Sequence, residues 1–304
     1  MKNVWIFICI LAVMFFGIGC TQKESQKMRG KVKIGAKNFT EQFILGRVMS
    51  LYLQKNGFEV KEHFNMGSAV VRKALENGQI DMYIEYTGTA YLVYHKGKDH
   101  KIMRDPQRLY TAVKKRDAKE GLVWLSPAKF NNTYTIMMKE DEARKLKLKT
   151  ISDLVAYIKE RPRRILFAMS AEFYGRPDGL NSLQRVYGFT FPSEALKKMD
   201  SGLTYKALKE GKVNVAMGFA TDGRVKGFGL INLIDDKGCF PVYNPAPVIR
   251  EETLERYPEI PELLNKLMPF LDTPTIMQLN YQVDVLHESA GEVCKCWLQK
   301  VGLI

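Results

Sequence analysis

The stretch Gln79–Thr89, QIDMYIEYTGT, decides the fold of this chain. Ile80, Met82 and Ile84 alternate with polar or aromatic residues, which is typical of a short half-buried strand. The glycine that follows permits a tight turn, and a threonine can cap a helix after it. The pattern therefore predicts Tyr86 at the carboxyl end of a strand and beside a helix N-terminus. Ligands bind at such places in open α/β sheets.

The segments around this stretch alternate between strand and helix patterns. Strands are expected where apolar and polar residues alternate, and helices where apolar residues recur on one face. The predicted strands are residues 31–36, 58–64, 123–125, 131–138, 165–169, 213–218 and 230–234. The predicted helices are residues 40–55, 69–76, 101–120, 152–159, 180–186, 204–209, 251–257, 261–271 and 289–301. Thr40 and Ser152 are the expected N-caps of their helices, with a polar loop at 170–179 and a turn near 273–279. This order predicts an α/β fold with parallel strands.

Two short segments of the chain resemble each other. Residues 74–81 (ALENGQID) match residues 207–214 (ALKEGKVN), and each reads as a helix end, a glycine stop and a strand start. The same register pairs Tyr86 with Phe219. Chance is the competing explanation, because the spans are short. If the match is real, two lobes of one topology lift an aromatic ring to corresponding strand ends, facing a shared cleft.

The composition allows two lobes. The chain has 304 residues, of which 46% are hydrophobic, and this is enough for two buried cores. The net charge is +13, and a surplus of this size could bind nucleic acid or an anionic membrane surface. Because the lysines and arginines are scattered, a solvated basic surface is the favoured interpretation. We predict no nucleic-acid partner.

The N-terminus has the pattern of an export signal. Residues 1–20 hold a lysine and then an apolar run of about 15 residues, shorter than the roughly 20 that a membrane span needs. The run ends in FGIGC, which resembles a bacterial lipoprotein cleavage box, although Gly17 stands where leucine is usual. We expect a signal peptide at 1–19, a lipid on Cys20 and a flexible tether at 20–30. This predicts a membrane-anchored lipoprotein, extracytoplasmic in the periplasm or on the cell surface.

The remaining cysteines are Cys239, Cys294 and Cys296. An exported location permits a disulfide between Cys239 and either of the other two. The Cys-Lys-Cys spacing also resembles a soft-metal pair, but no further ligand accompanies it. A structural role is favoured, and no metal site is predicted.

Catalytic signatures are missing from the sequence. It has no Gly-x-Ser-x-Gly elbow, no His-Glu-x-x-His and no dinucleotide loop, and Gly30–Lys37 lacks the lysine of a phosphate loop. The histidines (His63, His95, His100 and His287) have no metal-ligand spacing. We predict a protein that is not an enzyme and needs no cofactor. The alternative, a hydrolase or transferase on the same fold, would need a nucleophile beside His63 or His95.

Aromatic residues stand at strand ends and loop starts: Tyr86, Tyr134, Phe219 and Tyr243. Ring faces attract cations by about 0.5–2 kcal/mol per good contact. A quaternary ammonium has no N–H to donate, so a box of rings is its natural site. Ordinary core packing is the alternative for each ring.

Several motifs carry a family resemblance. KIGAKNFTEQ (33–42), EYTGT, NNTY, RPDG, TDGRVKGF, FPVYNPAPVIRE and LNYQVD occur in this order. Together they resemble the osmoprotectant-binding proteins of ABC importers, the ProX/OpuC-type receptors for glycine betaine, carnitine and choline. The resemblance covers about residues 31–304. It implies an extracytoplasmic monomeric receptor that hands its ligand to an ABC permease.

The resemblance also implies a type II periplasmic binding protein fold. In that fold two α/β lobes close on ligand like a hinge, with the ligand in the cleft between them. The crossing segments would lie near 131–134 and 240–244. Lobe 1 would hold 31–132 and 243–304, and lobe 2 would hold 133–242.

The same resemblance implies a ligand set. Tyr86, Tyr134, Phe219 and Tyr243 match the rings that box a trimethylammonium group, with phenylalanine at 219 in place of the usual tyrosine. Lys37, Thr89 and Arg176 match the anchors of a ligand carboxylate, and Asn132, Gln42 and Ser68 are further candidate contacts. Lysine and arginine pair with carboxylates, and choline has none, so we expect a betaine to be preferred over choline.

Two other functions remain open. An amino-acid or other small-solute receptor of the same fold would lack a functional cage. A basic adhesin or nucleic-acid-binding lipoprotein would rest on charge alone. The segment Tyr243-Asn244-Pro245 departs from the usual Tyr-Tyr-Ala, which leaves the ligand preference open.

Overall fold

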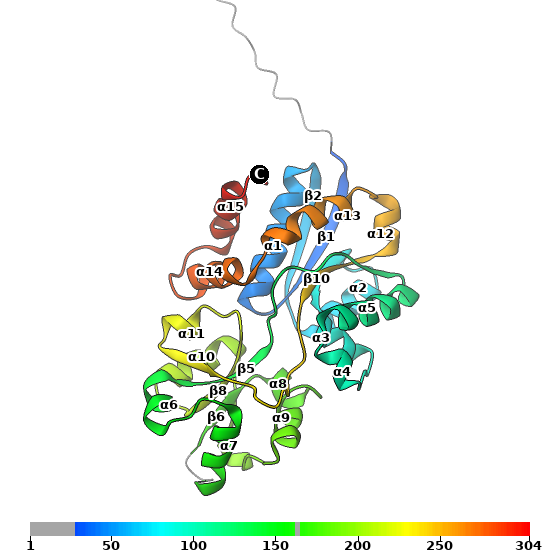
Figure 1. The fold of residues 1–304 in the computed structure, drawn as a ribbon. Coiled ribbons are helices and arrows are strands. Elements are labelled where there is room, and N and C mark those ends of the chain that lie inside the picture. Colours follow the sequence, from blue (N-terminus) through cyan, green and yellow to red (C-terminus); the bar gives the residue numbers. More distant parts are fainter. Residues whose placement is uncertain (1–27, 162–164) are drawn as a thin grey trace, which may run out of the picture.

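The computed structural model describes residues 28–161 and 165–304. The expected signal peptide, the lipidated Cys20 and most of the tether lie outside the described residues. Two five-stranded sheets form the framework, one in the upper and one in the lower half of Figure 1. We refer to the first sheet with its helices as lobe 1 and to the second sheet with its helices as lobe 2.

The sheet of lobe 1 is mixed rather than purely parallel. Its strand order is β2 (Phe58–Met66), β1 (Gly30–Lys37), β3 (Met82–Tyr86), β10 (Pro245–Arg250) and β4 (Leu122–Trp124). β1 runs parallel to β2 and β3, as the strand–helix–strand pattern predicts. β10 runs antiparallel to β3 and β4, because the chain returns to this sheet from lobe 2. The helices of lobe 1 are α1 (Thr40–Lys55), α2 (Ser68–Glu76), α3 (Thr87–Thr89), α4 (His100–Met103), α5 (Pro106–Asp117), α12 (Glu251–Arg256), α13 (Ile260–Leu267), α14 (Thr273–Asp284) and α15 (Ala290–Lys300).

The sheet of lobe 2 follows the same plan. Its strand order is β7 (Leu196–Lys198), β6 (Phe167–Met169), β8 (Val215–Phe219), β5 (Tyr134–Lys139) and β9 (Leu230–Leu233). β6 is parallel to β7 and β8, and β5 is antiparallel to β8 and β9. The helices of lobe 2 are α6 (Glu140–Leu146), α7 (Ile151–Glu160), α8 (Ala171–Gly175), α9 (Leu180–Tyr187), α10 (Ser201–Lys209) and α11 (Arg224–Gly227). Each lobe therefore has its own mixed sheet covered by helices.

The two segments that resemble each other in sequence fold alike. Gly78 ends α2 and Gly211 ends α10, each with a φ of 70° that favours glycine. Each then leads into a strand, and the last residues of these strands are Tyr86 and Phe219. The match in sequence therefore corresponds to a match in structure.

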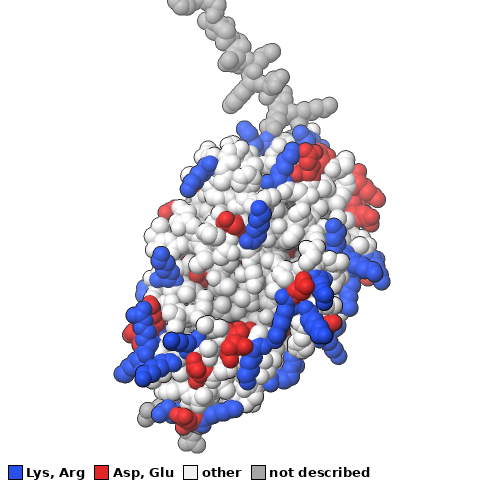
Figure 2. Space-filling model, viewed as in Figure 1, with Lys and Arg blue, Asp and Glu red and all other residues white. Residues whose placement is uncertain are grey.

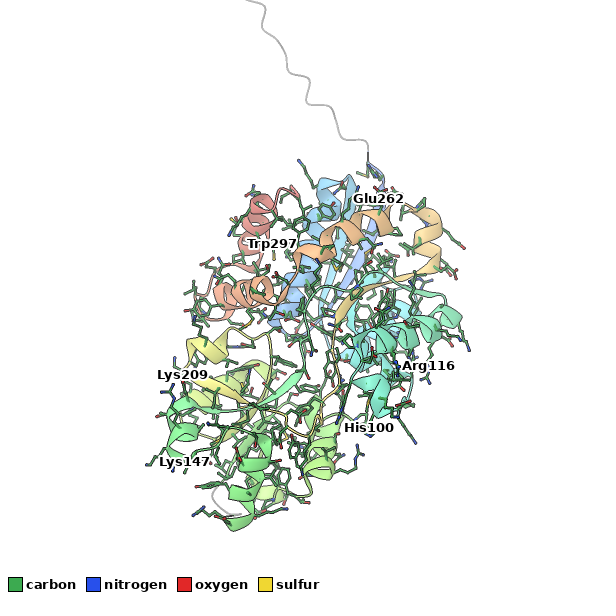
Figure 3. The ribbon with its side chains drawn as sticks, in the orientation of Figure 1. His100, Arg116, Lys147, Lys209, Glu262 and Trp297 are labelled. Atoms are coloured by element: carbon green, nitrogen blue, oxygen red, sulfur yellow. The ribbon has the colours of Figure 1, made fainter. Side chains whose placement is uncertain are left out.

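The core of lobe 1 is built on α1. Its apolar face, including Ile44 and Val48, packs on β1 and against the C-terminal helices. Cys294 and Trp297 of α15, the latter labelled in Figure 3, belong to this core. α1 begins immediately after β1, so this packing also fixes the loop that enters the region between the lobes.

Several local expectations are wrong in instructive ways. Thr40 does not cap α1: Phe39 is the N-cap residue, and the Thr40 hydroxyl instead donates to Asp284. α7 is capped by Thr150 rather than Ser152, in a capping box with Asp153.

Three further differences concern whole segments: 101–120 is split by Pro106 into α4 and α5, 170–179 contains α8, and 273–279 lies in the twelve-residue α14. The sequence analysis also assigned no element to α6, β7 or β10.

The disulfide that an exported location would permit is not formed. Cys239, Cys294 and Cys296 are free. Cys239 lies in lobe 2 beside Ser182, whereas the thiol of Cys294 faces the carbonyl of Ile44 in lobe 1. Burial raises the pKa of both Cys239 and Cys294 to about 12, so neither is a reactive thiolate.

The charged surface matches the expected solvated one. Figure 2 shows lysine and arginine spread over the visible face with aspartate and glutamate among them. The labelled Arg116, Lys147, Lys209 and Glu262 lie at the outer parts of the two halves in Figure 3. Within the described residues no helix is long and apolar enough to cross a membrane.

Candidate functional site

A cavity of about 610 Å³ opens between the two lobes. This volume lies within the range of small-molecule pockets, roughly 300–1,000 Å³. Side chains from both lobes line it. They include nine of the ten ligand contacts predicted from the sequence: Tyr86, Tyr134, Phe219, Tyr243, Lys37, Thr89, Arg176, Asn132 and Ser68.

Strand ends position the four predicted rings. Tyr134 opens β5 and is paired across the strands with Phe219 at the end of β8. Tyr86 ends β3 and is paired with Pro245 at the start of β10, two residues after Tyr243. The two sheets therefore present their rings at the edges that face each other.

Gly88 sets the position of Tyr243. It lies inside α3 rather than in the expected tight turn. A Cβ at this glycine would stand 2.8 Å from the Tyr243 ring and 2.7 Å from the Val242 carbonyl oxygen. The glycine is required because the ring and the crossing chain approach the α3 backbone closely.

The rings form one connected array. Tyr134 stacks on Phe219 with centroids 5.6 Å apart, and it meets Tyr243 edge-on at 5.5 Å. Phe39, which the sequence analysis did not select, stacks on Phe219 at 5.3 Å and on Tyr86 at 6.1 Å. Phe39 thus links the lobe 1 ring Tyr86 to the lobe 2 rings. It stands two residues after the end of β1, so the same strand-end rule that selected Tyr86 could have found it.

Two phenol groups of the cage are held by carboxylates. The hydroxyl of Tyr86 donates to Glu41 at 2.7 Å, and that of Tyr243 donates to Asp178 at 2.6 Å. Burial, with the neighbouring carboxylates, raises the pKa of both tyrosines well above the ordinary value. Both rings therefore stay neutral and keep their negative faces for a cation.

Lys37 is an ion-paired residue in the cavity wall. Its Nζ lies 2.5 Å from Oε1 of Glu85, and both side chains are buried. Glu85 also accepts hydrogen bonds from the hydroxyls of Tyr83 and Tyr94. Burial lowers the pKa of Lys37, and Glu85 opposes that shift. The expected anchor for a ligand carboxylate thus already has a carboxylate partner within the protein.

Arg176 bridges the lobes from the lobe 2 side. Its Nε and Nη2 bind Asp178 in a bidentate manner at 2.9 and 2.5 Å. Nη2 also donates to the hydroxyl of Thr89 in lobe 1 at 3.1 Å. The guanidinium lies 5.7 Å from the centroid of Tyr134, so it borders the ring array. Burial would lower the pKa of Arg176, but its anionic and phenolic neighbours hold it well above the ordinary value, and it is always charged.

The weaker predicted contacts have separate outcomes. The backbone N–H and the hydroxyl of Ser68 donate to Glu172 of lobe 2, so Ser68 joins the lobes at the cavity edge. Asn132 lines the cavity and donates to Glu41 at 2.8 Å. Gln42, the tenth predicted contact, is not among the residues that line the cavity. Its amide is occupied by the Lys37 N–H and the Ile84 carbonyl, which tie β1 to β3.

The described residues contain no cluster of three or more histidine, cysteine, aspartate or glutamate side chains that could hold a metal ion. The cavity itself presents rings, buried ion pairs and hydrogen-bond donors. These groups can bind a small molecule that carries a quaternary nitrogen and a polar end.

The two sheets and the cavity between them define a two-lobed solute-binding protein, and comparison with known proteins identifies its family. Residues 30–300 match the family described as the substrate binding domain of ABC-type glycine betaine transport system, OpuAC. The chain belongs to this family. Its fold is that of the type II periplasmic binding proteins, as the sequence resemblance implied.

Individual relatives agree with this assignment. A glycine-betaine-binding protein of Pseudomonas aeruginosa is 39% identical over 98% of this chain and 94% of that protein. An ergothioneine transport permease and binding protein of Helicobacter pylori is 36% identical over 89% of this chain, which spans 47% of that longer protein. A crystal structure of a glycine betaine/carnitine/choline ABC transporter protein is 29% identical and superposes with a TM-score of 0.72, over 90% of this chain and 99% of that one.

Proposed function

We propose that this chain binds a betaine-type osmoprotectant in the interlobe cavity and delivers it to the permease of an ABC importer. The connected ring array carries this proposal. A trimethylammonium group that enters it meets ring faces from both lobes, and each good contact contributes about 0.5–2 kcal/mol. The names of the family and of the Pseudomonas aeruginosa relative support a glycine betaine-like ligand.

The polar end of the ligand would be held by the donors that remain. A lysine ammonium has three donors and a guanidinium has five. Glu85 accepts one hydrogen bond from Lys37, and the Nη1 of Arg176 is 3.8 Å from Oε2 of Glu172, which is longer than a hydrogen bond. Both groups can therefore donate to a ligand carboxylate without giving up their partners.

The cavity also admits ligands longer than glycine betaine. In glycine betaine a single methylene separates nitrogen from carboxylate, so it would occupy a small part of about 610 Å³. The polar residues that line the rest of the cavity include Asn38, Asn65, Ser170, Lys198, Asp200 and Ser201. A betaine with a longer body could contact them.

We propose that the segments 131–134 and 240–244 form the hinge. Backbone and side-chain hydrogen bonds tie them together, from the Asn132 N–H to the Tyr243 carbonyl at 3.1 Å and from the Tyr243 N–H to Asn131 at 2.7 Å. Residues 31–132 and 243–304 would then move against 133–242. The protein would act as an extracytoplasmic monomer that a lipid on Cys20 anchors to the membrane. It would perform no covalent chemistry.

Calorimetry with a matched ligand panel tests the proposal. The panel pairs glycine betaine with dimethylglycine, and adds carnitine, ergothioneine and choline. A cage predicts that removing one methyl group weakens binding by at least tenfold, because the tertiary ammonium keeps an N–H that must be desolvated. Equal binding of the methylated and less methylated ligands would instead identify a small-solute receptor without a functional cage.

A further inference from the structure

Glu41 is a buried carboxylate beside the cage that the ligand contacts do not explain. It is the second residue of α1 and is 3% exposed. Its Oε1 accepts from Tyr86 at 2.7 Å and from Asn132 at 2.8 Å. Its Oε2 accepts from Thr221 at 2.5 Å and from Asn280 at 3.4 Å. Because all four neighbours are donors, the arrangement suits an ionised carboxylate.

These four donors come from different parts of the molecule. Tyr86 and Asn280 belong to lobe 1, and Asn132 belongs to the crossing segment. Thr221 alone comes from lobe 2, from the loop between β8 and α11, and it is 1% exposed. The contact between Glu41 and Thr221 therefore spans the two lobes, while the other three hold the carboxylate in place.

The stacked rings and the Glu41–Thr221 hydrogen bond lie at matching positions on two loops. Phe39 stands two residues before Glu41, and Phe219 stands two residues before Thr221. The rings of Phe39 and Phe219 stack at 5.3 Å, and the side chains of Glu41 and Thr221 are hydrogen-bonded. One approach of the two loops therefore forms both the ring contact and the hydrogen bond.

Further contacts fasten the same loop of lobe 2, and the first residue of α11, to α14. Asn280 donates to the Thr221 carbonyl at 3.0 Å, and Arg224 lies 3.3 Å from Asp284. A Cβ on Gly223 would stand 2.6 Å from the Tyr281 backbone, so this glycine permits the close approach. The loop thus docks on lobe 1 through several side chains, with Glu41 at the end nearest the cage.

Resting on the proposed function, we propose that Glu41 is a positioning residue that couples the cage to closure of the cleft. It orients the ring of Tyr86 and captures the hydroxyl of Thr221 when the lobes meet. A carboxylate that is removed from water needs its full set of donors. Without Thr221, the closed state leaves one donor missing from a buried charge, and the open state becomes relatively more favourable.

Thr221→Val, Glu41→Gln and the double variant test this coupling. Thr253→Val is the matched control, because its hydroxyl lies 3.3 Å from Asp81, away from the cavity. Glycine betaine affinity is measured by calorimetry, and the radius of gyration by small-angle X-ray scattering with and without ligand. We expect about a tenfold loss of affinity for each single variant, a double variant no weaker than Glu41→Gln, and no change for the control.

The scattering measurement separates this inference from the proposed function. If the wild type binds no betaine, the proposed function fails, yet the coupling still predicts a larger radius of gyration for ligand-free Thr221→Val than for the wild type. Thermal unfolding checks that each variant is folded. If Glu41→Gln does not fold, Thr221→Val alone is used to test the coupling. Unchanged affinity and radius for Thr221→Val, or additive losses in the double variant, would overturn the coupling.

Discussion

The ammonium of Lys37 and the carboxylate of Glu85 form an ion pair of 2.5 Å in which neither side chain is more than 3% exposed. This pair changes the argument about ligand charge. The sequence suggested that choline would leave Lys37 and Arg176 unpaired, but both have partners within the protein. A preference for betaines must therefore come from the donors that these groups still offer, and Arg176 offers them in planar geometry.

Arg176→Lys should separate betaines from choline. The substitution keeps the positive charge beside Asp178 but loses the planar fork that can face a ligand carboxylate. We expect glycine betaine affinity to fall by about tenfold, or about 1.4 kcal/mol, while choline affinity changes little. Calorimetry with both ligands measures the difference, and an equal loss for choline would show that Arg176 does not contact the carboxylate.

Phe39→Ala and Tyr134→Ala should each weaken betaine binding by tenfold or more, about 1.4 kcal/mol. Phe39 joins the rings of the two lobes, and Tyr134 contacts both Phe219 and Tyr243. Tyr157→Ala is the control, because this tyrosine lies on α7 and does not line the cavity. Dissociation constants that match the wild type in both cage variants would remove the basis of the aromatic cage.

The sequence predicted the rings because their positions follow a local rule. Tyr86 and Phe219 end strands whose alternation and glycine stops are visible in the residues themselves. Phe39 obeys the same rule but lies outside the repeated segment, so the internal match did not point to it. The α/β class was predictable for a similar reason, since most of the longer strands and helices carry their own periodicity, but the antiparallel directions of β10 and β5 were not, because strand direction depends on where the chain crosses between the lobes.

Glu41 and Gln42 show where such reasoning ends. A glutamate in the first turn of a helix is ordinarily a surface residue that favours the helix dipole. Its role here depends on Thr221 and Asn280, which are distant in sequence and meet it only after both lobes have folded. Gln42 shares the motif of Lys37 but does not line the cavity, and its amide binds the Lys37 N–H and the Ile84 carbonyl instead.

Asp117→Asn should destabilise lobe 1. Asp117 is fully buried and accepts two hydrogen bonds from Arg72, at 2.7 and 2.8 Å, and one from Trp124 at 2.6 Å. The variant leaves a buried arginine with a weaker partner, at a cost of about 3 kcal/mol. Urea unfolding at pH 7 measures it. Glu262→Gln, in an exposed pair with Lys266, should change little.

Asp117 should also make the stability of the chain depend on pH in the acid range. Burial would raise the pKa of Asp117, but hydrogen bonds from Arg72 and His95 outweigh burial and hold it well below the ordinary value. A carboxyl whose pKa is lowered by folding contributes stability above its unfolded pKa of about 3.9, and loses it as the pH falls further. The stability difference between wild type and Asp117→Asn should therefore narrow below about pH 4. A difference that is constant between pH 7 and pH 3 would contradict this assignment.

The titration of Glu41 should change the stability of the chain and its betaine affinity in opposite directions near neutral pH. Burial raises the pKa of Glu41 to about 7, although hydrogen bonds from Thr221, Tyr86, Asn132 and Asn280 oppose the shift. As the pH falls from about 7 towards the unfolded pKa of about 4.3, protonation of Glu41 stabilises the folded chain. A protonated carboxyl must itself donate, so it no longer accepts from all four neighbours.

Betaine affinity should therefore fall between pH 8 and pH 6, while the contribution of Glu41 to the free energy of unfolding rises. The betaine itself does not titrate in this range. The charged groups that share the small cavity beside Glu41 are Asp222, Arg224 and Asp284, and Glu41→Gln leaves all of them in place. Calorimetry and urea unfolding at pH 6, 7 and 8 compare the betaine affinity and the free energy of unfolding of the wild type and Glu41→Gln. The variant should show a flatter affinity profile, and an identical profile in both would assign the pH dependence to another group.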